Sequence, residues 1–462
     1  MIRNWLLIPL ILLVHLILLI NTRFTLWPEM VVYPYLLNNG FALYRDIINP
    51  YPPLLSYSLA IFAKIFGYQP LPYQILTWFL IIVIDLLLFL FSRKIFTKST
   101  AYFSLLFFAI LSIPFGINGL WFDLVQTPFI LASFYYFYKF FNNPKSGRLL
   151  FNSVLFLTIA LFIKQQIVWL ALWYLVIIFV KFANKTKKIF ARNYFIFAPI
   201  LIFLILQILF FWQRNLLKDF IFWIVYFPFF KASKMPGYLL LPTIRQALVV
   251  LALFLLFTPV LFKDKFKTIL IVLTGFILTL FAYPRFDYFH LIPSLAILSL
   301  AFGQNLKSFL KSKVVVQSVF ALGLIFLILF TIRYFKNNWT QEVRFFEKDI
   351  IKAASTLNKI TNPDDSIYIQ NGPDQLLALS NRLPSKPWAD EFPWYLEIPG
   401  LQEKVVEGIE KRDPKFIIFK PYDKGPKYEL GAYRPEEIAG YLEENYQNLT
   451  QVSDTLWLKV RK

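Results

Sequence analysis

Long hydrophobic runs alternate with short polar segments over residues 1–335. Most of these runs are long enough to cross the ~30 Å hydrocarbon core of a bilayer as helices. The pattern therefore predicts a polytopic α-helical membrane protein with about eleven transmembrane helices. The predicted spans are residues 5–22, 71–92, 100–116, 120–140, 149–163, 165–183, 194–213, 238–262, 267–284, 288–304 and 314–333.

The pattern changes after residue 335, where charged residues become frequent and hydrophobic residues come in short periodic groups. Helix-like and strand-like periods alternate there, which is typical of a small α/β domain. We therefore divide the chain into a transmembrane domain, residues 1–335, and an α/β domain, residues 336–462. The α/β domain is expected to contain helices at 342–357, 375–380, 401–412 and 435–446, and strands at 366–370, 415–420 and 455–460.

The composition supports the membrane prediction and restricts the chemistry. Hydrophobic residues make up 58% of the chain, whereas soluble domains contain about 45–50%. The absence of cysteine excludes disulfides and thiolate metal sites. A net charge of +20 would suit nucleic acid, but the positions of the basic residues assign most of it to loops on anionic lipid. No nucleic-acid partner is therefore predicted.

The basic residues also give the orientation in the membrane. If the N-terminus is cytoplasmic, every inside loop is basic, whereas the outside turn 116–120 has no basic residue. This asymmetry follows the positive-inside rule. An odd number of spans then makes the α/β domain extracytoplasmic. The inside loops carry Arg93, Lys94, Lys98, Lys139, Lys145, Arg148, Lys181, Lys185, Lys187, Lys188, Arg192, Lys263, Lys265, Lys267, Lys307, Lys311 and Lys313.

Residues 23–67, which we call loop one, are too polar for a membrane helix and too apolar for an ordinary loop. Two amphipathic stretches, 28–38 and 54–66, flank the rigid run 49–53. Amphipathic helices lie in the membrane interface with their apolar faces in lipid. The pattern therefore predicts a catalytic loop that rests on the outer membrane surface.

Three carboxylates are candidates for catalysis. Glu29 and Asp46 lie in loop one, where a general base could take a proton from an attacking hydroxyl. Each could instead cap an interfacial helix, and Asp46 could pair with Arg45, which is also a candidate for substrate binding. Asp123 lies at the outer end of a predicted span, where a carboxylate is costly unless it is paired or hydrated.

Several cations lie on the same predicted side of the membrane. Lys164 at a hairpin tip, Arg245 inside the span 238–262 and Arg285 are candidates for binding an anionic phosphate. The run 283–293 adds Tyr288 and His290 as candidates for substrate binding, and His290 could orient a substrate or bind a metal. Snorkelling and aromatic belts are the alternatives. His15 and Asp85 lie near the middles of two spans, and we interpret them as contacts between helices.

Loop one resembles a known family at Gly40, Tyr44, Arg45, Asp46, Pro52, Pro53, Tyr57, Phe66 and Gly67, which follow the pattern G…Y.D…PP…Y…FG. Together with the runs FIKQQIVWL and YPRFDYFHLIPSLAIL, this pattern resembles the GT-C superfamily of membrane glycosyltransferases. The likeness is greatest to bacterial relatives of protein O-mannosyltransferases and of lipid A aminoarabinose transferases.

The resemblance implies an inverting transfer of one sugar from a polyprenyl-phosphate carrier to a protein, lipid or glycan acceptor. The reaction would take place at the outer face of a bacterial plasma membrane. Glu29 matches the family's base and Asp123 its second acidic residue, while Lys164, Arg245 and Arg285 match the cations that hold the lipid phosphate. Some relatives bind a divalent metal and others need none, so no metal or other cofactor is assigned.

Two other functions are compatible with parts of the sequence. A non-catalytic membrane protein on the same scaffold could bind or translocate a lipid-linked sugar. A secondary transporter would place ionisable residues near mid-membrane and would often show inverted repeats. Apart from His15 and Asp85, the ionisable residues here gather at one face, and no repeat is visible, so the transporter is the weaker alternative.

Overall fold

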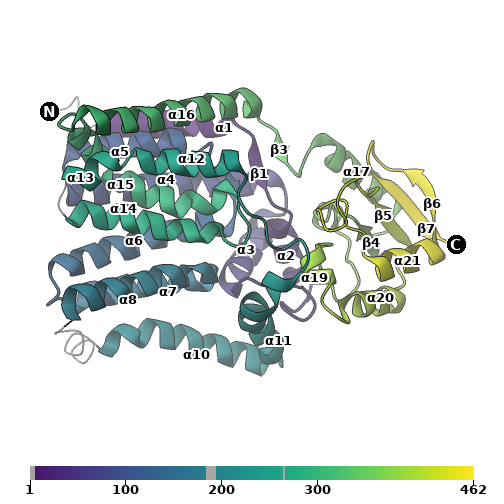
Figure 1. Ribbon diagram of the computed structural model, residues 1–462. Coiled ribbons are helices and arrows are strands. Elements are labelled where there is room, and N and C mark those ends of the chain that lie inside the picture. The colour runs from purple at the N-terminus through teal and green to yellow at the C-terminus, as the bar shows by residue number, and fades with distance from the viewer. Residues whose placement is uncertain (1–5, 184–193, 264–265) are drawn as a thin grey trace. The chain divides into compact units, whose positions relative to one another are not determined.

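The computed structural model describes residues 6–183, 194–263 and 266–462. The start of the first predicted span and the predicted inside-loop residues Lys185, Lys187, Lys188, Arg192 and Lys265 lie outside the described residues. The chain forms two compact units (Figure 1). The helical unit consists of Met1–Phe24, Ile75–Leu206 and Leu241–Gln341, and the mixed unit of Thr25–Gln74, Gln207–Leu240 and Glu342–Lys462.

The helical unit is a bundle of nearly parallel helices (Figure 1). Most of its helices coincide with the predicted hydrophobic runs, but the run 238–262 is divided between two shorter helices, Ile244–Leu255 and Thr258–Lys263, and residues 238–243 are not helical. The helices Pro70–Ile95 and Ala198–Gln213 each also contain residues of the mixed unit. The α-helices are α1 (Leu7–Ile20), α4 (Pro70–Ile95), α5 (Lys98–Leu111), α6 (Phe122–Asn142), α7 (Gly147–Ile163), α8 (Val168–Phe182), α10 (Ala198–Gln213), α12 (Ile244–Leu255), α13 (Thr258–Lys263), α14 (Phe266–Leu278), α15 (Ile292–Phe309) and α16 (Val314–Asn338). Short 3-10 helices are η2 (Gln165–Ile167), η4 (Tyr194–Phe197), η7 (Thr279–Ala282) and η8 (Tyr288–Leu291).

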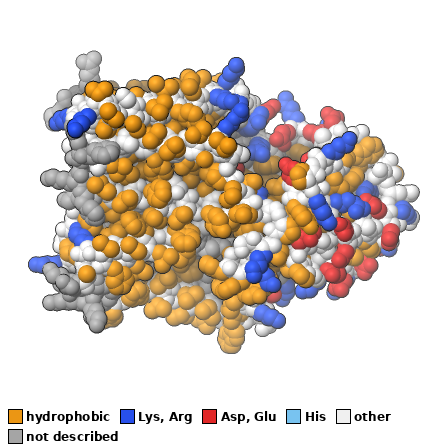
Figure 2. Space-filling model, in the orientation of Figure 1, with side chains coloured by type: hydrophobic (Ala, Val, Ile, Leu, Met, Phe, Trp, Pro, Cys, Tyr) orange, Lys and Arg blue, Asp and Glu red, His pale blue; other side chains and the backbone are white. Residues whose placement is uncertain are grey.

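Several of these helices are suited to a bilayer. Within the described residues, five are long and apolar enough to cross it: Pro70–Ile95, Gln165–Phe182, Tyr194–Gln213, Tyr288–Phe309 and Val314–Asn338. Figure 2 shows a largely hydrophobic surface over the helical unit. A helical membrane protein is therefore the class that the structure supports.

Helix α15 forms the centre of the helical unit. Fourteen of its 18 residues are buried, against three of the 25 residues of α16. Gly303 lets α15 approach α5 closely, because a Cβ there would collide with the carbonyl oxygen of Thr100. The Phe107 and Phe302 rings stack nearby at 3.8 Å between centroids. The outer helices thus pack around one buried helix.

The mixed unit combines loop one with the C-terminal residues. Its four-stranded sheet has the order β4-β5-β7-β6, with β4 and β5 parallel and the other pairs antiparallel. These strands are β4 (Ile367–Gln370), β5 (Phe416–Phe419), β6 (Tyr446–Gln451) and β7 (Trp457–Arg461). Further short strands of the chain are β1 (Phe24–Leu26), β3 (Val343–Arg344) and β2 (Gly119–Leu120), of which β2 belongs to the helical unit. The helices of the mixed unit are α2 (Glu29–Asn38), α3 (Pro53–Phe66), α11 (Leu217–Ile221), the π-helix η5 (Phe222–Lys231), η6 (Ala232–Lys234), α17 (Lys348–Ile360), α18 (Leu376–Ser380), α19 (Pro393–Leu396), α20 (Leu401–Arg412) and α21 (Glu436–Asn445).

Each predicted C-terminal element has a counterpart in this list, but one begins several residues later than predicted, and the short elements β3, α19 and β6 were not predicted. The helix expected from residue 342 begins at Lys348, because Val343 and Arg344 form β3. Strand β6 was not predicted, because five of its six residues are exposed and its polar sequence lacks a hydrophobic period. A domain boundary at residue 335 remains a prediction.

Loop one and the C-terminal residues are joined by backbone pairing. The Ile48 N–H donates to the Trp388 carbonyl at 3.1 Å, and the Trp388 N–H donates to the Asp46 carbonyl at 2.8 Å. Eight of the ten residues of α2 are buried within the protein. The prediction that the apolar face of 28–38 lies in lipid is therefore wrong. Helix α3 instead exposes Ile61 and Ile65, as an interfacial helix should.

Candidate functional site

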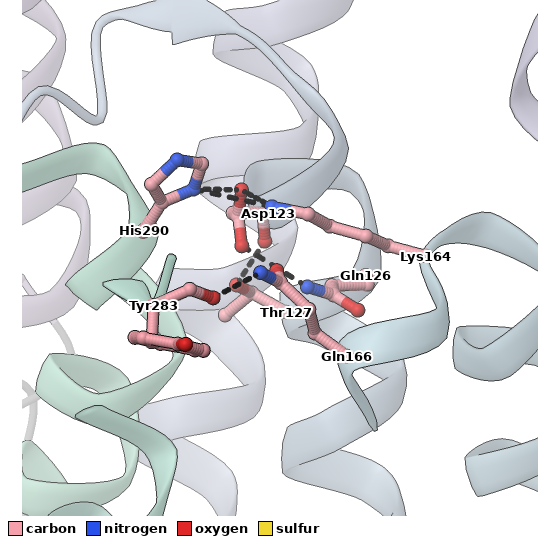
Figure 3. Close-up of polar contacts among 7 residues, drawn as sticks. All are labelled: Asp123, Gln126, Thr127, Lys164, Gln166, Tyr283 and His290. Carbon is pink, nitrogen blue, oxygen red and sulfur yellow. Dashed lines mark hydrogen bonds and ion pairs between the residues drawn. The ribbon is translucent and has the colours of Figure 1, made fainter. Parts of the chain in front are cut away.

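Three ionisable side chains from different parts of the helical unit meet in its interior (Figure 3). The Lys164 Nζ donates to Asp123 Oδ2 at 2.6 Å. The His290 Nδ1 lies 2.8 Å from the same carboxylate oxygen and 3.1 Å from Lys164 Nζ. We call Asp123, Lys164 and His290 the buried triad.

Each member of the buried triad stands at the end of a helix. Asp123 is in the first turn of α6, where the positive end of the helix dipole stabilises a carboxylate. Lys164 follows α7 in extended conformation, and His290 lies in η8 just before α15. Loops between helices therefore bring together residues that are far apart in the sequence.

The triad is almost fully buried. Asp123 is 0% exposed, Lys164 2% and His290 8%. A buried ion pair overcomes its desolvation cost only with good geometry and further hydrogen bonds, and Gln126 supplies one to the other oxygen of Asp123, at 3.2 Å. The imidazole Nδ1 either donates to the carboxylate or accepts from the ammonium. No described residue hydrogen-bonds His290 Nε2, which leaves this nitrogen for a ligand.

The other predicted phosphate-binding cations, Arg245 and Arg285, are more exposed than Lys164. Arg245 was expected about two turns inside a span, but α12 begins at Ile244, so Arg245 lies exposed in the first turn. Arg285 is half-buried in the run before η8. The Tyr288 ring packs edge-on against Phe115 and lies 5.3 Å from Phe330. The contacts that join Asp123, Lys164 and His290 to one another do not include Arg245, Arg285 or Tyr288.

In the mixed unit, Glu29 is the first residue of α2 and is 8% exposed. Burial raises its pKa to about 7, although a backbone hydrogen bond lowers it in part. Among the described atoms, none hydrogen-bonds Glu29 Oε2. A buried carboxylate with a pKa near neutrality and a free oxygen is what a general base requires.

Further acids of the mixed unit lie on both sides of α18, with Asp374 before this helix and Asp390 and Glu391 after it. Burial raises the pKa of Asp374 and of Asp390 well above the usual range, and the charge of Glu29 raises both further. Burial raises the pKa of Glu391 to about 7. The sequence offered one signal for Asp390 and Glu391, because aromatic residues flank them on both sides in PWADEFPW. Among the described residues, no group of three or more His, Cys, Asp or Glu is placed to hold a metal ion.

Asp46 has a different environment from Glu29. It accepts hydrogen bonds from the Ala42 N–H at 2.9 Å, from Arg45 Nε at 3.2 Å and from Lys386 Nζ at 3.1 Å. Burial raises the pKa of Asp46, but these three donors outweigh it and leave the pKa below the usual value. Asp46 is thus an ionised carboxylate with its oxygens already engaged.

Asp46 also lines a cavity of about 380 Å³ within the mixed unit. Tyr44, Arg45 and Asp46 form one side of it, and α20 forms another. Tyr44 has a φ of +75°, a sparsely populated conformation that tends to occur at functional sites. The remaining lining residues are Ile48, Asp219, Lys386, Pro387, Leu401, Lys404, Glu407, Gly408 and Lys411.

Comparisons with known proteins agree with this architecture. Residues 50–212 match the family model described as dolichyl-phosphate-mannose-protein mannosyltransferase. The fold is similar to that of ArnT from Cupriavidus metallidurans bound to undecaprenyl phosphate, with a TM-score of 0.64, 11% identity and 97% of each chain covered. No curated protein matches at the sequence level.

Two further solved structures are similar. The oligosaccharyltransferase of Archaeoglobus fulgidus, tethered to an acceptor peptide, has a TM-score of 0.54 at 10% identity and covers 98% of this chain and 74% of its own. The arabinofuranosyltransferase AftD from Mycobacteria has a TM-score of 0.52 at 11% identity and covers 99% of this chain and 41% of its own. The resemblance to the GT-C superfamily seen in the sequence is confirmed, and the chain has the GT-C fold.

Proposed function

We propose that the chain is a glycosyltransferase that moves one sugar from a polyprenyl-phosphate donor to an acceptor, with inversion and with Glu29 as general base. The observation that carries this proposal is the buried Glu29 carboxylate, whose pKa is about 7 and whose Oε2 has no partner among the described atoms. The GT-C fold supports it, since the similar ArnT structure contains undecaprenyl phosphate.

The reaction is a single displacement. Glu29 takes the proton of an acceptor hydroxyl as that oxygen attacks the anomeric carbon of the donor sugar. The bond between this carbon and the phosphate oxygen breaks, and polyprenyl phosphate leaves with the bonding electron pair. Attack from the face opposite the leaving group inverts the configuration. The phosphate is a good leaving group, so a base and charge stabilisation suffice.

The buried triad is the proposed site for the donor phosphate. Lys164 supplies a cation, and the unpartnered Nε2 of His290 supplies a further hydrogen-bonding group. Asp123 holds both groups through one oxygen, which makes it a positioning residue in this scheme. Arg245, Arg285 and Tyr288 are proposed as weaker contacts to the donor at the membrane surface.

The cavity beside Asp46 is the proposed site for the acceptor. A cavity of about 380 Å³ falls within the range for small-ligand sites, and its charged lining offers many hydrogen bonds to hydroxyl groups. Arg45 is half-exposed there. The acceptor, whether protein, lipid or glycan, is then bound by the same unit that carries the base.

The proposed membrane arrangement follows the sequence. About eleven helices cross a bacterial plasma membrane, the N-terminus is cytoplasmic, and the C-terminal α/β elements are extracytoplasmic. The alternative function, a non-catalytic protein that binds or translocates lipid-linked sugar, would use the buried triad but not Glu29.

The test uses purified protein in lipid with a panel of polyprenyl-phosphate sugars. Release of polyprenyl phosphate is followed for the parent, for Glu29→Gln, and for the exposed control Glu410→Gln. Release by the parent and the control that falls by about 10²–10⁴-fold in Glu29→Gln would support the transferase and its base. Equal release by all three would move the base elsewhere. Donor binding without release would favour the non-catalytic alternative.

A further inference from the structure

The segment 217–234, which we call the outer segment, has two different faces. It comprises α11, η5 and η6 and lies wholly within the mixed unit. Phe220, Trp223 and Phe227 are buried, with exposed fractions of 0–6%. Large apolar side chains that are 44–60% exposed form the opposite face: Ile221, Val225, Tyr226, Phe229 and Phe230.

The π-helix explains how these side chains come to share a face. Its hydrogen bonds join residues five apart, so residues four or five apart lie one above the other. Ile221, Val225, Tyr226 and Phe230 have this spacing. The exposed face is therefore a continuous apolar strip along the helix.

The buried face holds the outer segment against the C-terminal part of the chain. Trp223 and Phe227 each pack on Tyr395, with ring centroids 6.1 Å apart. Tyr238 lies 6.2 Å from Phe227 and 6.2 Å from Trp394. Helix α19 thus covers the inner face, and the apolar strip points away from these contacts.

Chain connectivity places the start of this segment at a membrane surface. The apolar helix Tyr194–Gln213 is long enough to cross a bilayer, and α11 begins only four residues after its end, at Leu217. Four residues span at most about 14 Å. The headgroup layer on each side of the hydrocarbon core is several ångströms thick, so the segment begins in or beside this layer.

The charges of the segment match an anionic surface. Arg214, Lys218, Lys231 and Lys234 are exposed, whereas the sole carboxylate of 214–234, Asp219, is half-buried at the cavity beside Asp46. Lys231 lies 5.9 Å from the Tyr226 ring, so basic and aromatic groups sit side by side. Figure 2 shows basic and hydrophobic side chains together over the region of α11. Basic residues around an apolar face are typical of helices that bind anionic lipid.

We propose that the outer segment is an interfacial anchor that binds the surface of an anionic bilayer. Val225, Tyr226, Phe229 and Phe230 enter the boundary between headgroups and acyl chains, and the lysines contact lipid phosphates. Because the inner face packs on Trp394 and Tyr395, the anchor holds the C-terminal part of the chain at the membrane. This role is independent of the proposed transferase activity.

The test exploits the absence of cysteine from the chain. Single cysteines at Val225 and at Phe229 are labelled with a nitroxide in the full-length protein, reconstituted in discs with a quarter of anionic phosphatidylglycerol. A cysteine at Glu410, exposed on α20, is the matched control. Collision rates with oxygen and with a water-soluble nickel complex are then measured. We expect an oxygen-to-nickel ratio at 225 and 229 that is several-fold above that at 410, and equal ratios would overturn the anchor.

A second experiment tests whether the lipid must be anionic, and whether a second copy of the chain covers the apolar strip in place of lipid. In discs without anionic lipid, the ratio at 229 should fall, and Lys231→Glu combined with Lys234→Glu should abolish this dependence on lipid charge. An identical ratio in both kinds of disc would refute the role of anionic lipid. Dipolar broadening between labels, with no response to the lipid, would show that a second copy of the chain covers the strip and would overturn the proposal.

Discussion

The Tyr33 hydroxyl donates a hydrogen bond of 3.0 Å to Asp390, a residue 357 positions further along the chain. Tyr33 lies one helical turn after Glu29 on α2, so this bond fixes the helix that carries the proposed base. The Tyr33 ring also packs against Trp388 at 5.8 Å. The C-terminal residues are therefore part of the environment of Glu29, and they add acids to it.

These buried acids should make the mixed unit more stable at low pH. The folded-state pKa of Glu29 and of Glu391 is about 7, above the value of about 4.3 for an exposed glutamate. Their contribution to the free energy of unfolding is fully present below pH 4.3 and is lost as the pH rises through 7. The pKa values of Asp374 and Asp390 are shifted in the same direction.

We therefore expect a thermal midpoint in detergent that is several degrees higher at pH 5 than at pH 8. Tryptophan fluorescence can follow the transition. Glu391→Gln should reduce the difference, because a neutral amide has no proton to lose, whereas the exposed control Glu410→Gln should leave it unchanged. A midpoint that rises from pH 5 to pH 8 would contradict the assigned pKa shifts.

The same pKa predicts the pH dependence of transfer. A general base works only when ionised, so the rate should increase with pH from 6 to 8 and level off above the Glu29 pKa of about 7. Initial rates of polyprenyl phosphate release at saturating donor would show the midpoint. Substitution of the exposed Glu410 should not move it. A rate that is constant between pH 5.5 and 8 would exclude Glu29 as the base.

Asp46 should be less important for chemistry than Glu29. Its oxygens already accept three hydrogen bonds, and its pKa lies below the usual value. Asp46→Asn should lower turnover by about tenfold at most, against about 10²–10⁴-fold for Glu29→Gln. The stability loss should be up to about 1 kcal/mol, because the partners Arg45 and Lys386 are half-exposed and solvent screens both pairs. If Asp46→Asn abolishes turnover while Glu29→Gln retains it, the roles are reversed.

Local pattern was sufficient for most of the secondary structure. Uninterrupted apolar runs predicted the helices of the helical unit, because backbone groups in lipid must be satisfied within the helix. The helix at 401–412 was predicted to the residue. The amphipathic pattern at 28–38 also gave a helix, but it cannot say whether lipid or protein covers the apolar face, and here the side chains are buried.

Contacts between residues that are far apart in the sequence could not be predicted from the local sequence pattern. Asp123, Lys164 and His290 were each singled out, but nothing in their spacing showed that one carboxylate oxygen contacts both partners. Asp374 and Asp390 were missed because their neighbourhood with Glu29 depends on tertiary packing. The sequence therefore identified single ionisable residues more readily than the neighbouring residues that contact them or shift their pKa values.

Loss of one partner of the buried pair His15 and Asp85 should lower stability rather than impair catalysis directly. His15 Nδ1 lies 2.7 Å from Asp85 Oδ2, both side chains are 0% exposed, and the contact joins α1 to α4. His15→Leu leaves a buried carboxyl group without its partner and should cost about 3–5 kcal/mol. The double variant His15→Leu/Asp85→Leu should recover most of this loss in thermal unfolding. A double variant as unstable as the single variant would show that the pair itself stabilises the fold.

The buried triad allows function to be separated from folding. Lys164→Met leaves Asp123 fully buried without its cation, which should cost about 3–5 kcal/mol in the free energy of unfolding. Lys164→Met combined with Asp123→Leu removes both charges and should restore most of the stability. Thermal unfolding of the parent, the two single variants and the double variant completes the cycle.

The double variant then tests the proposed phosphate site directly. If Lys164 binds the donor phosphate, the double variant should not bind polyprenyl phosphate even though its stability is restored, because the ammonium that pairs with the phosphate is gone. Binding of a polyprenyl phosphate to parent and double variant in the same detergent gives the comparison, with His15→Leu/Asp85→Leu as a control for loss of another buried pair. A stable double variant that binds as tightly as the parent would limit the triad to a structural role and would move the phosphate site to other cations, of which Arg285 is the first to test.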